Sequence, residues 1–270
     1  MRHTVITVPA SEKIYKLYKY RAFNEFTNDI ILKSSLWYAN PTRFNDPFDM
    51  SPSFRQKYSK REIREHIKDF VKNSENTKNL TIDEQEKYRR EFEKQSNTDQ
   101  KFVAKRERLF FEQISTTGVV SLSKHYDSIL MWSHYAQNHE GLVFEFDYTG
   151  KKFNLHEFPH KVEYIDGYGL LSHAALHAER REDMNTILLS KYNDWSYEGE
   201  YRIIDFDFQG NKPFKKELLT KIIFGLRASP EDMKNMIKLC RENGFEHVVF
   251  EKAEKVEGTF SLRMVPYIEP

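Results

Sequence analysis

Short, alternating aromatic runs flank a stretch with helical spacing near the start of the chain. The runs are "KIYKLYKYRAF" and "SSLWYAN", and alternation of this kind is typical of strands. Between them, residues 25–33 have the spacing of a compact helix. Asn45, Asp46 and Pro47 then predict a turn, because Asn and Asp bond their own backbone and the proline keeps Asp46 out of helical geometry. We therefore expect strand, helix and strand.

The segment 55–113 differs in composition from its surroundings. It is highly charged and poor in glycine and proline, and its apolar residues recur at helical spacing. Thr81 and Glu84 fit a capping box, in which each side chain binds a backbone N–H at the start of a helix. We predict a charged helical insertion with a solvated face; a lid or a target-recognition arm is the functional alternative.

The rest of the chain mixes strand and helix patterns. A helix in "DSILMWSHYA" is capped by Asp127 or Ser128, a long helix is expected at about 170–191, and a further helix begins after the N-cap Ser229. The expected strands are "GVVSLS", "GLVFEFDY", "EYRIIDF", "KIIFGL", "HVVFE" and "FSLRMVPY". Strands and helices do not alternate strictly, and neither a dinucleotide-binding nor a P-loop glycine motif occurs. The pattern favours an α+β fold with a mixed or antiparallel sheet, forming a single domain over residues 1–270.

Composition narrows the classes of partner. The 270 residues include 42 Lys and Arg against 41 Asp and Glu, so the formal net charge of +1 gives no global field that would attract nucleic acid or an acidic membrane. One cysteine cannot form an intrachain disulfide, and the sequence shows neither a signal-peptide pattern nor an apolar run of membrane-spanning length. We expect a cytoplasmic protein that does not bind membranes.

Two pairs of polar residues stand at strand spacing. Ser121 and Ser123 in "SLS", and Glu198 and Glu200 in "EGE", would each share a face, because strand residues two apart point the same way. The glutamates fit either a solvated strand edge, where an arginine such as Arg202 pairs with them, or a catalytic acid beside a cleft. The serines fit ordinary polar strand positions equally well.

Taken in order, these features resemble those of the ADP-ribosyltransferase superfamily. "LYKYRAFNEFTNDIILKSSLWYANP" is similar to the opening of DNA-targeting ADP-ribosyltransferase toxins, and a later S-x-S strand and a late E-x-E follow it. Through "LWYANPTRFNDPFD", "MWSHYA" and "EGEYRI", residues 15–267 also resemble a bacterial and phage family of unknown function. The second resemblance covers more of the chain and implies no activity.

The superfamily resemblance implies NAD as a substrate, no metal, and a set of site residues. Glu200 would stabilise the positive charge that develops on the ribose as nicotinamide leaves, and Glu198 would activate the acceptor. Lys19 stands where the toxins have histidine, whereas Arg21 could supply the arginine of another class. The residues implied to contact NAD are Lys19, Tyr20, Arg21, Tyr38, Asn45, Asp46, Ser121 and Ser123.

The resemblance leaves the acceptor open: a nucleic acid, a protein side chain or water. A toxin or phage-defence role would fit the resemblance, and a neutralising protein is a candidate partner for such a role.

Two alternatives belong to other classes of protein. One is a non-catalytic module that binds a ligand or a partner. The other is a metal-dependent nuclease that would use Asp46, Asp49, His134 and Glu140, although the spacing of His134 and His139 does not put both on one helical face.

Overall fold

The computed structural model describes residues 5–7, 16–51, 59–73, 77–95, 99–150, 152–154, 157–167 and 181–268. The chain divides into two compact units. The first contains Met1–Arg43, Thr116–Tyr164 and Asn193–Pro270, and the second contains Phe44–Ser115 and Ile165–Tyr192. The segment predicted to be a helical insertion, residues 55–113, therefore lies entirely in the second unit.

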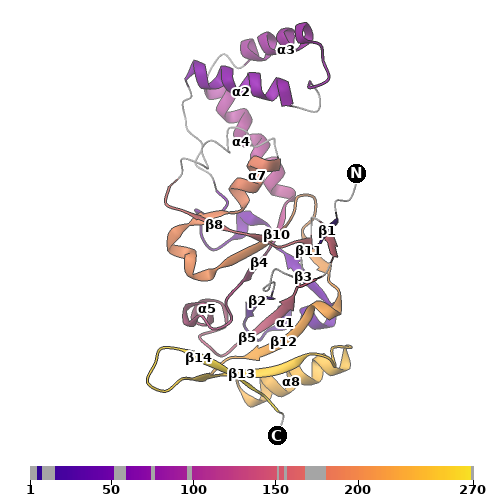
Figure 1. The fold of residues 1–270 in the computed structure, drawn as a ribbon, viewed down its shortest axis with the longest axis vertical. Coiled ribbons are helices and arrows are strands. Elements are labelled where there is room, and N and C mark those ends of the chain that lie inside the picture. Colours follow the sequence, from indigo (N-terminus) through magenta and orange to yellow (C-terminus); the bar gives the residue numbers. More distant parts are fainter. Residues whose placement is uncertain are drawn as a thin grey trace. The chain divides into compact units, whose positions relative to one another are not determined.

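An eight-stranded mixed sheet forms the centre of the first unit (Figure 1). β12 and β13 pair in parallel, and the other neighbours are antiparallel. In sheet order the strands are β14 (Leu262–Pro266), β13 (Val249–Lys255), β12 (Leu219–Phe224), β5 (Leu142–Asp147), β2 (Lys16–Arg21), β4 (Gly118–Ser123), β10 (Glu200–Asp205) and β7 (His160–Lys161). The predicted combination of helices with a mixed sheet is confirmed.

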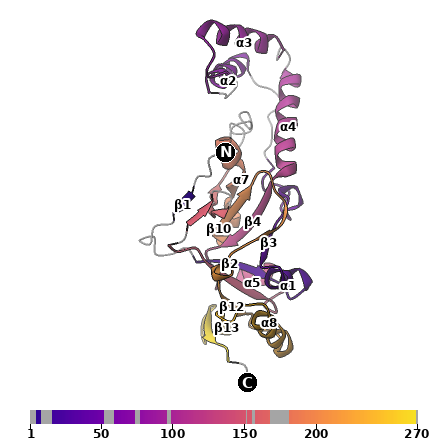
Figure 2. The same cartoon turned by 90° about the vertical axis from the view of Figure 1, so that its right-hand side faces the viewer.

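The two faces of this sheet carry different cores. Helices α1 (Glu25–Leu32) and α8 (Pro230–Glu242) pack against each other on one side of the strands (Figure 2). Their apolar side chains meet the buried residues of the larger core, such as Phe144 and Ile222. On the other face, Met131 and Trp132 of α5 (Ile129–Tyr135) pack on Tyr18 and Tyr20. This second core is smaller, and polar side chains lie beside it.

Short elements complete the first unit. β1 pairs with β6, and β11 pairs with β3. Their bounds, with those of the remaining short elements, are β1 (Val5–Thr7), β3 (Ser35–Tyr38), β6 (Lys152–Asn154), β8 (Glu163–Ile165, whose last residue belongs to the second unit), β11 (Gly210–Pro213), and the 3-10 turns η1 (Pro41–Arg43), η3 (Asn193–Glu198) and η4 (Lys216–Leu218).

The predicted caps form as their side-chain chemistry requires. Ser128 and Ser229 accept hydrogen bonds from backbone N–H groups at the starts of α5 and α8. Thr81 and Glu84 make the reciprocal bonds of a capping box at the start of α3 (Ile82–Gln95). The predicted turn after the second strand also forms, since Asp46 Oδ1 accepts from the backbone N–H of Phe48 at 2.9 Å. These local predictions are confirmed.

The second unit is mainly helical. Its elements are α2 (Lys60–Asn73), α3 (Ile82–Gln95), α4 (Asp99–Thr116, whose last residue belongs to the first unit), α7 (Arg181–Leu188) and β9 (Ser190–Tyr192). α2 packs against α3, and Phe110 and Ile114 of α4 are buried. Lys191 and Asp49 form a buried ion pair at 3.6 Å. Among the described residues, no helix is both long and apolar enough to span a membrane.

Two predicted elements need correction. The long helix expected at 170–191 is wrong at its C-terminal end, because α7 stops at Leu188 and Ser190–Tyr192 is a strand. Residues 170–180 of that prediction lie outside the described residues. The strand geometry expected across "EGE" is also wrong: Asn193–Glu198 forms η3, and β10 begins only at Glu200.

Candidate functional site

A row of polar side chains crosses five neighbouring strands of the sheet. Glu200 of β10 lies opposite Ser123 of β4, and Ser123 lies opposite Tyr18 of β2. Tyr18 is opposite Glu145 of β5, which is opposite Lys221 of β12. Directly opposed residues point to the same side of a sheet, so the row lies on the face that carries α5. Residues from distant parts of the sequence thereby form one continuous polar line.

At one end of this row, Glu200 forms a buried ion pair with Arg202. The guanidinium donates from Nε to Oε1 at 2.8 Å and from a terminal nitrogen to Oε2 at 2.9 Å. The side chains are 5% and 0% exposed, respectively. They share a face because they stand two residues apart in β10. The solvated-edge interpretation of Glu200 is therefore wrong, and the arginine that pairs with it comes from the same strand.

Glu198 lies in the turn before β10 and not in the strand that contains Glu200. It ends η3, and Gly199 then takes a positive φ of 50°, a conformation in which glycine has no steric cost. The Tyr135 hydroxyl donates to Glu198 Oε1 at 2.6 Å, and the Ser123 hydroxyl donates to the Glu198 carbonyl. The expectation that strand alternation aligns Glu198 with Glu200 is wrong, because the turn at Gly199 interrupts the strand. Both glutamates are nevertheless buried.

The serines occupy the strand next to β10. Ser121 is opposite Arg202, as Ser123 is opposite Glu200, so the expected shared face of the two serines is confirmed. Ser123 also accepts a hydrogen bond from the backbone N–H of His125. The S-x-S strand and the strand that begins with Glu200 are thus immediate neighbours.

Alternation in β2 puts Lys19 and Arg21 on the face opposite to Tyr18. The Lys19 ammonium nevertheless reaches the neighbouring strand, where it donates to the Ser121 carbonyl at 3.0 Å. Desolvation, with the nearby Arg21 charge, lowers the pKa of Lys19 from 10.5 to about 7, and Glu200 partly opposes that shift. Arg21 donates to Thr27 of α1, and burial lowers its pKa.

The other residues implied to contact NAD lie elsewhere. The Tyr20 hydroxyl donates to the His125 carbonyl, and its ring meets Trp132 edge-on in the smaller core. Tyr38 belongs to the larger core, on the opposite face of the sheet from Glu200. Asn45 and Asp46 belong to the second unit. The structure therefore brings together Ser121, Ser123, Glu198 and Glu200 from the predicted set, and Lys19 reaches the backbone of Ser121 from the other face of the sheet.

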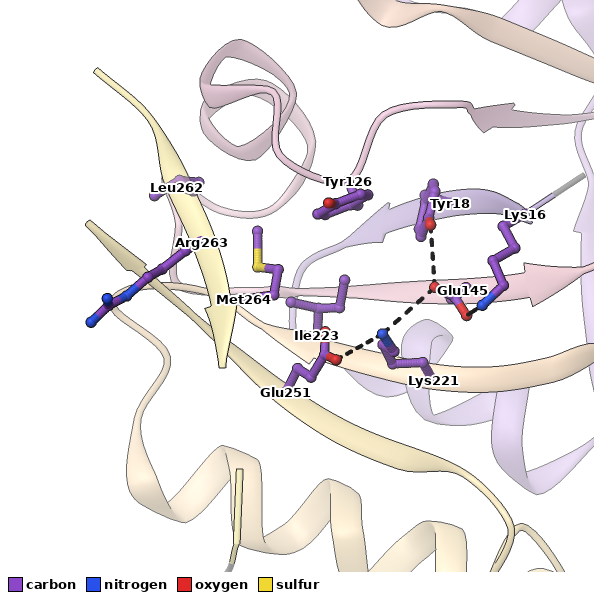
Figure 3. Close-up of a pocket in the computed structure, with 10 residues that line it drawn as sticks. All are labelled: Lys16, Tyr18, Tyr126, Glu145, Lys221, Ile223, Glu251, Leu262, Arg263 and Met264. Atoms are coloured by element: carbon purple, nitrogen blue, oxygen red, sulfur yellow. Dashed lines mark hydrogen bonds and ion pairs between the residues drawn. The ribbon is translucent and has the colours of Figure 1, made fainter. Parts of the chain in front are cut away.

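The other end of the polar row opens into a cavity of about 490 Å³ (Figure 3). At its polar end, the buried carboxylate of Glu145 accepts from Lys16 Nζ at 3.0 Å, from the Tyr18 hydroxyl at 3.2 Å and from the Thr220 hydroxyl at 2.9 Å. Lys221 Nζ lies 3.9 Å from the same carboxylate. Burial and the Glu145 charge raise the pKa of Tyr18 well above its ordinary value.

Sequence reasoning missed this cavity. The signal was a single glutamate, Glu145, inside the otherwise apolar run "LVFEF" of a central strand. A glutamate at such a position is rarely buried without partners. The partners themselves come from β2 and β12, and no local pattern indicates that those strands flank β5.

The residues of the metal alternative are not gathered at one place. In the described part of the chain, no three His, Cys, Asp or Glu side chains form a group able to hold a metal ion. Glu140 pairs with Arg227 at 2.9 Å, and the His134 ring lies beside Tyr135 and Tyr197.

Part of the chain is similar to a family of known sequences. No curated protein and no solved structure matches the chain. Residues 131–203 match the model of a family described as "Protein of unknown function (DUF2971)". This segment includes "MWSHYA" and "EGEYRI", two of the three stretches that resemble a family of unknown function, and it runs from α5 to the Glu200–Arg202 pair. The chain is thus similar to that family over the segment that carries both glutamates.

Proposed function

We propose that the protein is an NAD-dependent ADP-ribosyltransferase, or an NAD glycohydrolase that uses the same residues. The observation that carries the proposal is the register of β4 and β10, which places Glu200 opposite Ser123 and Arg202 opposite Ser121. A late glutamate supported by a serine-bearing strand is the arrangement that the superfamily resemblance implies. Glu198 and Lys19 lie beside these strands.

Glu200 would stabilise the positive charge of the transition state. The bond between the nicotinamide nitrogen and ribose C1′ breaks, and its electron pair leaves with nicotinamide, which departs as a neutral base. A carboxylate held in place beside the ribose offsets the charge that develops on C1′, an effect on the order of 3 kcal/mol. The acceptor atom then bonds to C1′ and transfers its proton to Glu198.

Arg202 fits this scheme as a positioning residue. Its two hydrogen bonds fix the orientation of the Glu200 carboxylate. Each carboxylate oxygen has two acceptor sites, so an oxygen that binds the arginine can also accept a hydrogen bond from a ribose hydroxyl. The pair also reduces the cost of keeping Glu200 charged in a buried position. The acceptor in this proposal is a nucleobase, a protein side chain or water.

Replacing Glu200 tests the proposal. Glu200→Gln keeps the side-chain shape and removes the charge, so we expect nicotinamide release to fall by about 100-fold or more, in kcat rather than in KM. Glu242→Gln on the exposed face of α8 is the matched control and should retain wild-type activity. Nicotinamide production by purified protein would be measured by chromatography.

Because Glu200→Gln leaves a buried guanidinium without its counter-charge, a loss of stability could mimic a loss of catalysis. The double variant Glu200→Gln/Arg202→Met removes both charges, and its thermal unfolding midpoint should stay closer to that of the wild type. Folded variants with undiminished nicotinamide release would contradict the proposal. Wild-type protein without turnover, in the presence of cell extract as a source of acceptors, would favour the non-catalytic binding module.

A further inference from the structure

The cavity next to Glu145 is a built site that the proposed NAD chemistry does not use. Its lining contains none of the residues assigned to NAD cleavage. Figure 3 shows the residues that line it, among them Lys16, Tyr18, Tyr126, Glu145 and Lys221. They fall into a charged group, an aromatic pair and an apolar group. All come from the first unit.

The charged group has more hydrogen-bond donors than it uses. An ammonium carries three N–H donors, and among the described residues Glu145 is the hydrogen-bond acceptor of Lys16. The Lys16 side chain is 46% exposed, so its remaining donors can reach a ligand. Lys221 is held between Glu251 at 2.7 Å and Glu145 at 3.9 Å, whereas Arg263 donates to Glu254, which does not line the cavity. Lys16 is therefore the group best placed to bind an anion.

Packing alone does not account for this network. A buried, charged network is often no more stabilising than apolar residues of the same volume. Glu145 nevertheless sits between the apolar residues Phe144 and Phe146 and takes hydrogen bonds from Lys16, Tyr18 and Thr220. Its hydrogen bond holds the ammonium of Lys16 in one position in the lining of the cavity. Such an arrangement is expected where the orientation of one cation matters to a ligand.

The aromatic pair, Tyr18 and Tyr126, and the apolar group can pack against a planar ring of a ligand. Tyr126 keeps 39% of its surface exposed, and its ring centre lies 5.2 Å from that of Tyr18. Ile223, Leu262 and Met264 supply apolar side chains in the same cavity (Figure 3). Tyrosine and methionine side chains both pack well against planar heterocycles.

We propose that this cavity binds a ribonucleoside 5′-monophosphate. The base packs on Tyr126 and the apolar group, and the phosphate accepts hydrogen bonds from Lys16. A cavity of about 490 Å³ is within the range of pockets that hold ligands of this size. Lys16 supplies the charge, and Tyr126 with the apolar group supplies the stacking surface. The site goes beyond the proposed enzymatic function and does not depend on it.

Calorimetric titration with AMP, GMP, CMP and UMP tests the site, with the four parent nucleosides as phosphate-free controls. We expect at least one monophosphate to bind about tenfold more tightly than its nucleoside. Lys16→Gln should abolish this advantage of the phosphate, and Lys16→Arg should largely restore it. Tyr126→Ala should weaken nucleotide and nucleoside alike by about tenfold, whereas Tyr126→Phe retains the ring and should bind as the wild type does.

Two further variants separate this site from other effects. Lys234→Gln removes an exposed cation from α8, on the other side of the sheet, and should leave binding unchanged. Glu200→Gln should abolish NAD cleavage and leave monophosphate binding intact, so either proposal can fail without the other. The inference is overturned if none of the four monophosphates binds at about 1 mM. It is equally overturned if binding is insensitive to both Lys16→Gln and Tyr126→Ala in variants with wild-type unfolding midpoints.

Discussion

Glu200 and Glu145 are buried on one face of the sheet, and their hydrogen-bond donors come from different parts of the fold. Glu200 receives both hydrogen bonds from one guanidinium in its own strand, so its orientation is set locally. Glu145 receives donors from β2 and from the start of β12, so its environment depends on the assembled sheet. Removing one partner of a buried pair costs more than the pair contributes, because the remaining charge stays buried. A substitution at either glutamate therefore needs a stability measurement beside it.

Lys19 gives a pH-dependent prediction at the residue scale. Its pKa in the folded protein, about 7, lies below the ordinary value of 10.5, so the folded state binds fewer protons than the unfolded state between these values. Wild-type stability should therefore rise with pH across that interval, by no more than about 1.4 kcal/mol per pH unit from this group. Lys19→Met removes the dependence. The stability advantage of the variant over wild type should be largest at about pH 7 and should shrink towards about pH 10.

Urea unfolding of both proteins across this pH range measures the difference directly. Parallel stability curves for wild type and Lys19→Met would show that Lys19 keeps its ordinary protonation in the folded state.

At the scale of elements, the backbone conformation of Gly199 sets the relative positions of Glu198 and Glu200. The sequence "EGE" reads as a strand because its carboxylates alternate, but the positive φ at Gly199 lets η3 end directly against β10. A pattern of polar side chains does not report a backbone angle, and glycine is compatible with both conformations. Caps such as Ser229 were predictable because their chemistry is local. The pairing of Glu198 with Tyr135 of α5 was not, because it requires knowing where η3 meets that helix.

Gly199→Ala tests this role. A Cβ at position 199 would lie 2.7 Å from side-chain atoms of both Lys124 and His125, in addition to the strain of the positive φ. We expect a loss of about 2 kcal/mol or more in the free energy of unfolding. Gly258 has a φ of 74°, and a Cβ added there would have no atom within 4 Å, so Gly258→Ala isolates the strain and should cost about 1 kcal/mol. Equal losses in urea unfolding would show that the contacts of Gly199 do not matter.

At the scale of the whole molecule, the sequence predicted most elements of the sheet but not their neighbours. "GVVSLS" and "EYRIIDF" were recognisable as strands from composition and alternation. The order β12, β5, β2, β4, β10 depends on pairings between distant segments, which no local pattern encodes. The alignment of Glu145 and Glu200 in one polar row could therefore not be predicted, although both residues lie in strands that were predicted. Strand alternation alone, however, predicts that Lys19 and Arg21 point to the opposite face of the sheet from Tyr18.

The rate at which the Cys240 thiol is labelled reports whether the larger core stays folded. It is the only cysteine of the sequence, it is buried in α8, and its burial raises its pKa to about 12. Because the thiolate is the reactive form, a disulfide reagent should label the folded protein at least about 100-fold more slowly than the denatured protein. The labelling rate should then follow global unfolding. Rapid labelling without denaturant would show that α8 detaches from the sheet on its own.

The central claim, that Glu200 belongs to an NAD-cleaving site, is tested most directly by nicotinamide release from NAD. Purified wild-type protein would be assayed with and without cell extract, beside Glu200→Gln and Glu242→Gln. The account predicts nicotinamide release by wild type and Glu242→Gln, with the signal reduced by about 100-fold or more in Glu200→Gln. No release by wild type in either condition, or equal release by all three folded proteins, would contradict it.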